Sequence, residues 1–410
     1  FQANTSTATN FFVGNVDVTD DMVADDAARN HVYSGQAIQP ISITMGTPEN
    51  PVKIQVTDEV ANVVYTKAGS TDPVDPIDAG TYTASITTKD GSPYNFAGTV
   101  TRTFTITPAV IDDATEDATA KLTYNGEGQQ PAMNVMASYG KDATDTDTAI
   151  GVRKALVNIP AVPANPEVPG DEGTPAVTNY AFTYAVDSTV DPNNAKLTEA
   201  VEDNPQLPLN AGSYTATIAS ASANYVLAST VKANASDAAY AADFYTPFKG
   251  DANTFDPAVK FEVAPFLLDT SSAAVTAGKL VDGEIADMTF TGADQQKDIA
   301  VGIQVDLKGD GTKTALVPAV RDDAGAITAA NDFSFIVDWP AGTPVAEQVV
   351  KNVGPYNLAI TGHGNYTTAV PDSDPPVTTL AAVLRVLGAT IADATVSVDP
   401  VTFTGSKLGA

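Results

Sequence analysis

The stretch Asp78-Ala79-Gly80-Thr81-Tyr82-Thr83-Ala84 has two further copies in the chain, at residues 210–216 and 352–358. Each copy is called a corner motif below. It begins with an Asp or Asn, whose side chain can hydrogen-bond to nearby backbone, and its third residue is a glycine, which tolerates positive φ. An alternating segment follows, which in the first copy places Tyr82 and Ile86 on one face and hydroxyl residues on the other. The corner motif therefore predicts three β-strands, each of which begins at a tight turn.

The tyrosines of the three corner motifs, Tyr82, Tyr214 and Tyr356, have the spacing of a tyrosine corner. In that structure the hydroxyl caps upstream backbone at one end of an immunoglobulin-type sandwich. A chain of 410 residues suits roughly three or four sandwiches of about 100 residues each. We therefore expect an all-β chain of tandem immunoglobulin-like β-sandwich domains in an elongated array.

Other segments recur in the same order around each corner motif. An opening motif, Tyr-x-Gly or Phe-x-Gly, occurs at Tyr33, Tyr124, Phe290 and Phe403. Aromatic middle strands are expected at residues 63–66, 179–184 and 332–337, turns with Asn and Tyr at 94–95, 224–225 and 365–366, and last strands at 102–107, 259–264 and 383–387. This order resembles the bacterial Ig-like repeats of large adhesins and other cell-surface proteins, of the MBG and related Big types. The resemblance implies a fold and a cell-surface setting, but it does not specify a partner.

The repeat order predicts the domain boundaries. Residues 1–28 form an N-terminal segment with a strand that can be exchanged, residues 29–110, 111–268 and 269–392 form three Ig-like domains, and residues 393–410 start a further repeat or donate a strand to a neighbour. Domain 2 is the longest because it carries a proline-rich loop between Ile159 and Val177 and an Ala/Asp/Tyr stretch over 233–255. A short helix over 236–244, capped by Ser236, is expected in that stretch.

Composition excludes several classes of function. The 50 acidic and 21 basic residues give a formal net charge of −29, so nucleic acid and anionic membranes are poor partners. The chain has no cysteine, which excludes disulfides, thiolate zinc sites and thiol catalysis. No apolar run approaches the ~20 residues of a transmembrane segment. The first residue is Phe and not Met, which indicates a cleaved chain and an extracellular location at the cell surface.

The sequence contains none of the usual catalytic motifs. The two histidines, His31 and His363, fall in different expected domains, so we expect no enzyme and no organic cofactor. Calcium is the one metal with candidate ligands, because Asp142, Asp145 and Asp147 could offer carboxylate oxygens from one loop. A second segment, 306–311, resembles the start of an EF-hand loop, but Lys308 stands at a ligand position and a hairpin turn is favoured.

Two functions from different classes fit these observations. The first is an extracellular structural and adhesive surface protein, an Ig-like repeat subunit of a stalk, filament or surface layer (S-layer) that associates with copies of itself through terminal strands and domain contacts. The alternative is a ligand-binding adhesin module that recognises a host protein or glycan through the loops of domain 2. Its candidate contact residues are aromatic: Tyr240, Phe244, Tyr245 and Phe248. The same side chains would cover that domain's own core if they are buried.

Overall fold

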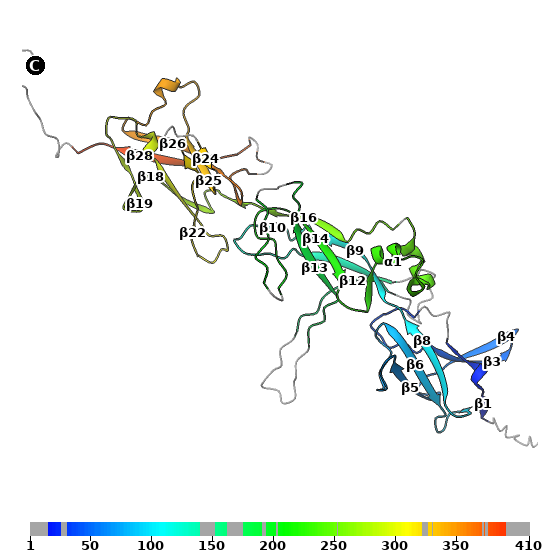
Figure 1. Ribbon diagram of the computed structural model, residues 1–410. Helices are drawn as coiled ribbons and strands as arrows, with labels where there is room; N and C mark the ends of the chain where they lie inside the picture. The colour runs from blue at the N-terminus through cyan, green and yellow to red at the C-terminus, as the bar shows by residue number, and fades with distance from the viewer. Residues whose placement is uncertain are drawn as a thin grey trace, which may run out of the picture. The chain divides into compact units, whose positions relative to one another are not determined.

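The computed structural model describes residues 15–25, 31–139, 152–161, 175–190, 194–201, 204–251, 253–321, 327–329, 331–370, 373 and 376–390. The expected all-β class is confirmed, because the chain is built from several β-sheets and contains little helix. The strands fall into three groups, numbered in chain order below, and each sheet takes its strands from one group (Figure 1). None of the helices in the described ranges is long and apolar enough to cross a membrane.

Strand group 1 contains three sheets, ordered β1-β7, β2-β3-β4 and β5-β6-β8. Its strands are β1 (Val16–Val18), β2 (Val23–Asp25), β3 (Ile41–Thr47), β4 (Asn50–Gln55), β5 (Asn62–Lys67), β6 (Gly80–Thr87), β7 (Tyr94–Phe96) and β8 (Val100–Ile106), with a 3-10 turn at Asp20–Met22. The first corner motif opens β6, and its predicted inward residues Tyr82, Ala84 and Ile86 are all buried. Phe104 of β8 stacks on Tyr82 with ring centroids 5.7 Å apart, which ties the two paired strands to one core.

Strand group 2 contains two four-stranded sheets, ordered β12-β11-β9-β15 and β10-β16-β14-β13. Its strands are β9 (Ala109–Glu116), β10 (Leu122–Thr123), β11 (Met133–Tyr139), β12 (Val152–Leu156), β13 (Tyr180–Val186), β14 (Gly212–Ser220), β15 (Tyr225–Leu227) and β16 (Ala258–Ala264). Between β15 and β16 lie α1 (Ala228–Ala233), 3-10 turns at Ala238–Tyr240 and Asp243–Tyr245, and α2 (Thr246–Lys249). The second corner motif opens β14, where Tyr214, Ala216 and Ile218 alternate into the core.

Strand group 3 contains four sheets, ordered β17-β27, β19-β18-β21-β22, β20-β28-β26-β25 and β23-β24. Its strands are β17 (Phe266–Leu267), β18 (Ala273–Val281), β19 (Glu284–Ala286), β20 (Met288–Thr289), β21 (Ala300–Val305), β22 (Thr314–Ala315), β23 (Val320–Arg321), β24 (Ile327–Ala329), β25 (Phe333–Val337), β26 (Gly354–Gly362), β27 (Tyr366–Thr367) and β28 (Leu380–Leu387), with 3-10 turns at Gln296–Asp298 and Val345–Glu347. The third corner motif opens β26, which pairs with β25 and β28. Leu384 and Val386 of β28 enter the core, so this copy makes its last strand from leucine and valine.

Two compact units divide the chain, and their boundary runs through strand group 2. The first unit takes residues up to Ala120, Pro131–Ala185 and Thr215–Phe261. The second takes Lys121–Gln130, Val186–Tyr214 and the residues from Glu262 onward. Strands β13, β14 and β16 each contribute residues to both units.

Three local expectations have a definite outcome. The N-terminal strand expected to be exchanged is β1 at residues 16–18, and it pairs in parallel with β7 of its own chain. The helix expected over 236–244 is wrong: α1 ends upstream at Ala233, and Asp237 caps the short turn after it by accepting from the N–H of Ala239. The segment that resembles an EF-hand is the hairpin turn that was favoured, since Asp306 accepts from two backbone N–H groups at 2.8 Å each, between the antiparallel strands β21 and β22.

Candidate functional site

Each corner motif closes its own turn with a tyrosine hydroxyl. The hydroxyl donates to the carbonyl oxygen four residues upstream, over 2.9 Å from Tyr82, 2.6 Å from Tyr214 and 3.0 Å from Tyr356. This bond holds the turn that leads into β6, β14 and β26. The three corners are therefore alike in their local geometry.

The corners differ in what covers them. Ala79 of the first corner and Ala211 of the second are 8% and 2% exposed, whereas Val353 at the same position of the third is 56% exposed. Tyr356 is partly exposed, while the tyrosines of the first two corners are buried. Another segment of the chain therefore covers the first two corners.

Asn224 covers the first corner. Its Oδ1 accepts from the backbone N–H of Ala79 at 2.8 Å, and its Nδ2 donates to Oδ1 of Asp78 at 2.9 Å. The carbonyl oxygen of Asn224 accepts from the N–H of Ala109 at 2.9 Å, just before β15 pairs in parallel with β9. One asparagine thus satisfies a nearly buried backbone donor in strand group 1 from a position held by strand group 2.

Asn365 covers the second corner in the same way. Its Oδ1 accepts from the N–H of Ala211 at 2.9 Å and from Nδ2 of Asn194 at 3.1 Å. The carbonyl oxygen of Asn365 accepts from the N–H of Phe266 at 2.8 Å, just before β27 pairs in parallel with β17. The contact between strand groups 1 and 2 is therefore repeated between strand groups 2 and 3.

The tyrosine after each asparagine adds an aromatic contact to the opening motif. Tyr225 meets Tyr33 edge to face with centroids 5.4 Å apart, and Tyr366 meets Tyr124 in the same way at 5.6 Å. Burial raises the pKa of the Tyr225 and Tyr366 hydroxyls above the usual value. We call the whole contact a joint: a corner motif and an opening tyrosine on one side, and an Asn-Tyr pair on the other.

No protein-family model and no curated protein matches this chain. The joints are therefore interpreted from their own chemistry.

Strand group 1 has the position of the Asn-Tyr pair but lacks the asparagine. The Pro93 carbonyl oxygen accepts from the N–H of Val16 at 2.7 Å, as the asparagine carbonyls do in the two joints. Strand β7 pairs with β1 in the same parallel register as β15 with β9 and β27 with β17. Pro93-Tyr94 is therefore the equivalent pair, one residue before the Tyr94-Asn95 pair expected from the sequence.

The hydrogen bond between Asn224 and Asp78 in the first joint can be tested by replacing the asparagine with aspartate, which adds a negative charge. Asn224→Asp would bring a second carboxylate to within hydrogen-bonding distance of Asp78, whereas Asn365→Asp keeps the acceptor that Ala211 and Asn194 use. We expect Asn224→Asp to lower the free energy of unfolding at pH 7 by about 1–3 kcal/mol, because a donor is lost and like charges meet. Asn365→Asp should be close to neutral.

The pH dependence separates this repulsion from a packing defect. Protonation of the introduced carboxylate removes the repulsion, so the difference between the melting temperatures of Asn224→Asp and Asn365→Asp should shrink as the pH falls from 7 to 4. Calorimetry at several pH values measures it. A difference that is independent of pH would show that the carboxylates do not meet.

The candidate site residues from the sequence do not converge on one place. The proposed Ca²⁺ ligands Asp142, Asp145 and Asp147 lie outside the described residues. Among the residues that are described, no group of three His, Asp or Glu side chains is arranged to hold a metal ion.

The four aromatic residues proposed for ligand contact form a packed cluster in strand group 2. Phe244 and Tyr245 are 1% and 0% exposed, and Tyr240 and Phe248 pack against them with centroids 5.2 and 5.8 Å apart. The Tyr245 hydroxyl donates to the carbonyl oxygen of Pro108 at 3.0 Å. Phe244 and Tyr245 are therefore core residues, and neither ring is open to a sugar.

The buried Tyr245 hydroxyl gives a test at alkaline pH. Burial raises the pKa of Tyr245 to about 12, above the usual value of about 10. The folded state therefore holds this proton more tightly, and the stability it contributes is complete below pH 10 and lost as the pH rises from 10 to 12. The phenolate absorbance is measured against pH for the unchanged chain and for Tyr245→Phe. The difference between the two curves should show one tyrosine that titrates above pH 10. A group that titrates near pH 10 would mean that the hydroxyl is open to water.

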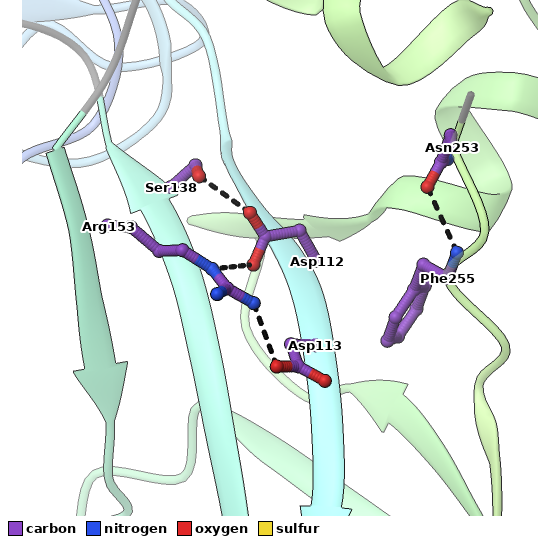
Figure 2. A network of polar contacts seen from close by, with 6 residues as sticks. All are labelled: Asp112, Asp113, Ser138, Arg153, Asn253 and Phe255. Atoms are coloured by element: carbon purple, nitrogen blue, oxygen red, sulfur yellow. Dashed lines mark hydrogen bonds and ion pairs between the residues drawn. The ribbon is translucent and has the colours of Figure 1, made fainter.

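A polar recess of about 480 Å³ lies beside β9 and β12. Figure 2 shows Arg153 between two carboxylates, donating from Nε to Asp112 at 3.0 Å and from Nη2 to Asp113 at 2.9 Å, while the Ser138 hydroxyl donates to Asp112 at 2.7 Å. The hydrogen bond to Asp112 raises the pKa of Arg153. Phe255 lines the recess across from this network. Because both carboxylates are engaged by one guanidinium, the network cross-links β9 to β12.

Sequence reasoning missed the residues that matter most here. Asn224 and Asn365 were recognised only as members of a recurring turn. Asn precedes Tyr in the second and third copies but not in the first, yet the same dipeptide at residues 179–180 is part of no joint, so the dipeptide alone does not mark one. Asp112 and Arg153 carry no signal either, because their contact joins different strands across a sheet.

Proposed function

We propose that this chain is a structural and adhesive protein of a cell surface, built from tandem Ig-like sandwiches and forming part of an extracellular stalk, filament or surface layer. The observation that carries the proposal is the joint, which occurs twice with the same asparagine Oδ1 to backbone N–H bond and the same tyrosine pair. A chain that repeats both its modules and the contact between them is suited to mechanical spacing.

The chemistry of the joints suits an acidic surface protein. With a formal net charge of −29, neighbouring repeats repel one another. The joints hold through neutral amide hydrogen bonds and edge-to-face aromatic pairs, which salt screens little. One charged contact supplements the second joint, where Lys308 pairs with Glu127. The joints should therefore persist over a wide range of ionic strength.

In this proposal the chain associates with copies of itself through its terminal segments and domain contacts. The test is negative-stain microscopy of the full chain beside variants that lack residues 1–14 or 393–410, with circular dichroism to verify that each variant is folded. The first deletion stops before β1, which pairs with β7 of its own chain. We expect fibres or sheets from the full chain and isolated molecules from the truncated chains. Isolated molecules from the full chain at every concentration would contradict the assembly role.

The ligand-binding alternative has less support. It depended on exposed aromatic rings in the loops of domain 2, and two of the four are buried. The polar recess does not restore it, because Arg153 engages Asp112 and Asp113, and the third carboxylate, that of Asp256, accepts from the backbone N–H of Ala258. We therefore propose the structural role alone.

A further inference from the structure

The residues around the third corner make the same hydrogen bonds as those around the second corner, which a joint covers. Gln129 Nε2 donates to the carbonyl oxygen of Thr123 at 2.9 Å, and Gln295 Nε2 donates to that of Thr289 at 3.0 Å. Their backbone N–H groups also match, since each donates to a carbonyl a short distance before its own corner, at 2.8 and 2.9 Å. The opening glycines Gly126 and Gly292 share a left-handed backbone with φ of 82° and 79°.

What the third corner lacks is an occupant among the described residues. Val353 is 56% exposed, compared with 2% for Ala211, and Phe290, at the place of the opening tyrosine, is 37% exposed. Two apolar side chains that a joint would cover therefore face solvent together with the backbone of the turn. A face built in advance in this way loses little conformational entropy when a partner binds.

We propose that the third corner, formed by residues 352–356 and Phe290, is a docking site for a further repeat that presents an Asn-Tyr pair at the start of a parallel strand. The asparagine amide would accept from the N–H of Val353, as it does from Ala211, and the tyrosine would meet Phe290 edge to face. The two joints within this chain set the chemistry of the occupant. The proposal rests on their geometry and not on the extracellular role.

A second copy of this chain is not the occupant that the joint chemistry specifies. The end that it could offer, in strand group 1, carries Pro93-Tyr94, and proline has no side-chain amide to bond the corner. The Asn-Tyr pairs at residues 224–225 and 365–366 are already engaged in joints. The third such pair, at residues 179–180, is engaged within strand group 2, where Asn179 is buried and its Nδ2 donates to the carbonyl oxygen of Val157 at 2.8 Å. Asparagine at position 93 should therefore convert the chain into a donor for its own kind of corner.

Trp339 reports on the third corner directly. It is the one tryptophan of the chain, and its ring meets Tyr356 edge to face with centroids 5.9 Å apart. Occupation of the corner should change its emission. A donor chain that carries Trp339→Phe is silent in this measurement, so the signal comes from the receptor alone.

The experiment titrates a donor chain into the unchanged chain and follows Trp339 emission. The donor carries Pro93→Asn to supply the pair, Val353→Arg to block its own corner, and Trp339→Phe. The control donor differs only in keeping Pro93. We expect a saturable change with the donor, a change at least tenfold weaker with the control donor, and the same tenfold loss when the receptor carries Val353→Arg. Sedimentation should show a species of twice the chain mass in the productive mixture.

A second donor guards against a misfolded Pro93→Asn loop. This donor carries Ala79→Arg together with Val353→Arg and Trp339→Phe. Ala79→Arg displaces the first corner from Asn224 and frees a native Asn-Tyr pair, so this donor should also change the Trp339 emission of the receptor. If neither folded donor alters the emission, the proposal is overturned. It is also overturned if the control donor binds as tightly as the asparagine donor, since the corner would then accept a second copy without the amide. Both readings are independent of whether chains form fibres through their terminal segments.

Discussion

Replacing Tyr214 by alanine is expected to lower the free energy of unfolding of the unit that contains it by about 3–5 kcal/mol. The ring is 0% exposed, so its removal leaves a cavity in the core of strand group 2. Its hydroxyl also accepts from the N–H of Lys196 at 3.0 Å and donates to the carbonyl oxygen of Asn210 at 2.6 Å. Calorimetry of the full chain should show the corresponding transition shifted to lower temperature.

The same substitution at the third corner is the matched control. Tyr356 makes the same bond to its own turn but is partly exposed, so Tyr356→Ala should cost only about 1–2 kcal/mol. Tyr214→Phe keeps the ring and removes the hydroxyl, and it should cost about 1–2 kcal/mol because polar groups of the turn lose a partner. Equal losses for Tyr214→Ala and Tyr356→Ala would mean that the third corner is as well covered as the second.

Gly212→Ala is expected to be comparably damaging, with a loss of about 2–6 kcal/mol in the free energy of unfolding. The backbone at Gly212 has φ of 148°, a region that costs an L-residue about 1–3 kcal/mol. A Cβ there would also lie 2.6 Å from Cβ of Ala195, whose backbone cannot swing away, which adds about 1–3 kcal/mol of overpacking. Urea unfolding followed by circular dichroism measures the sum.

Two other corner glycines separate the strain from the clash. Gly354 has nearly the same φ, 144°, but an added Cβ would meet no atom within 4 Å. Gly354→Ala should therefore show the strain alone. Gly80 is intermediate, because the atom nearest to its added Cβ is the flexible end of Lys67, which can move. The loss in the free energy of unfolding should be largest for Gly212→Ala, smaller for Gly80→Ala and smallest for Gly354→Ala. Any other order would contradict the packing described around Gly212.

Much of the fold could be predicted because it depends on neighbours in the sequence. The glycine of each corner motif and the alternation after it dictate a turn followed by a strand, and β6, β14 and β26 all begin at that glycine. The helix in strand group 2 was misplaced because its alanines and the caps at Ser236 and Asp237 favour a helix locally, whereas the chain forms two short 3-10 turns there. Tertiary packing of Phe244 and Tyr245 decided where the chain turned.

The joints could not be predicted, because they depend on distance in space. Asn224 reaches Ala79 across 145 residues, and Asn365 reaches Ala211 across 154. Nothing local to either asparagine distinguishes a residue that caps its own turn from one that satisfies a backbone donor of the preceding strand group. The burial of Tyr214 and the exposure of Tyr356 are likewise consequences of whether a partner is present.

The amino-acid sequence by itself determined that this protein is all-β, where three of its strands begin, and which residues of those strands face inward. Backbone dihedral preferences and side-chain alternation act over a few residues, so they can be read along the chain. Only the tertiary structure decided which corners are covered and by what. A corner is covered only when a segment far away in the sequence packs against it, and the pattern of neighbouring residues does not specify such a contact.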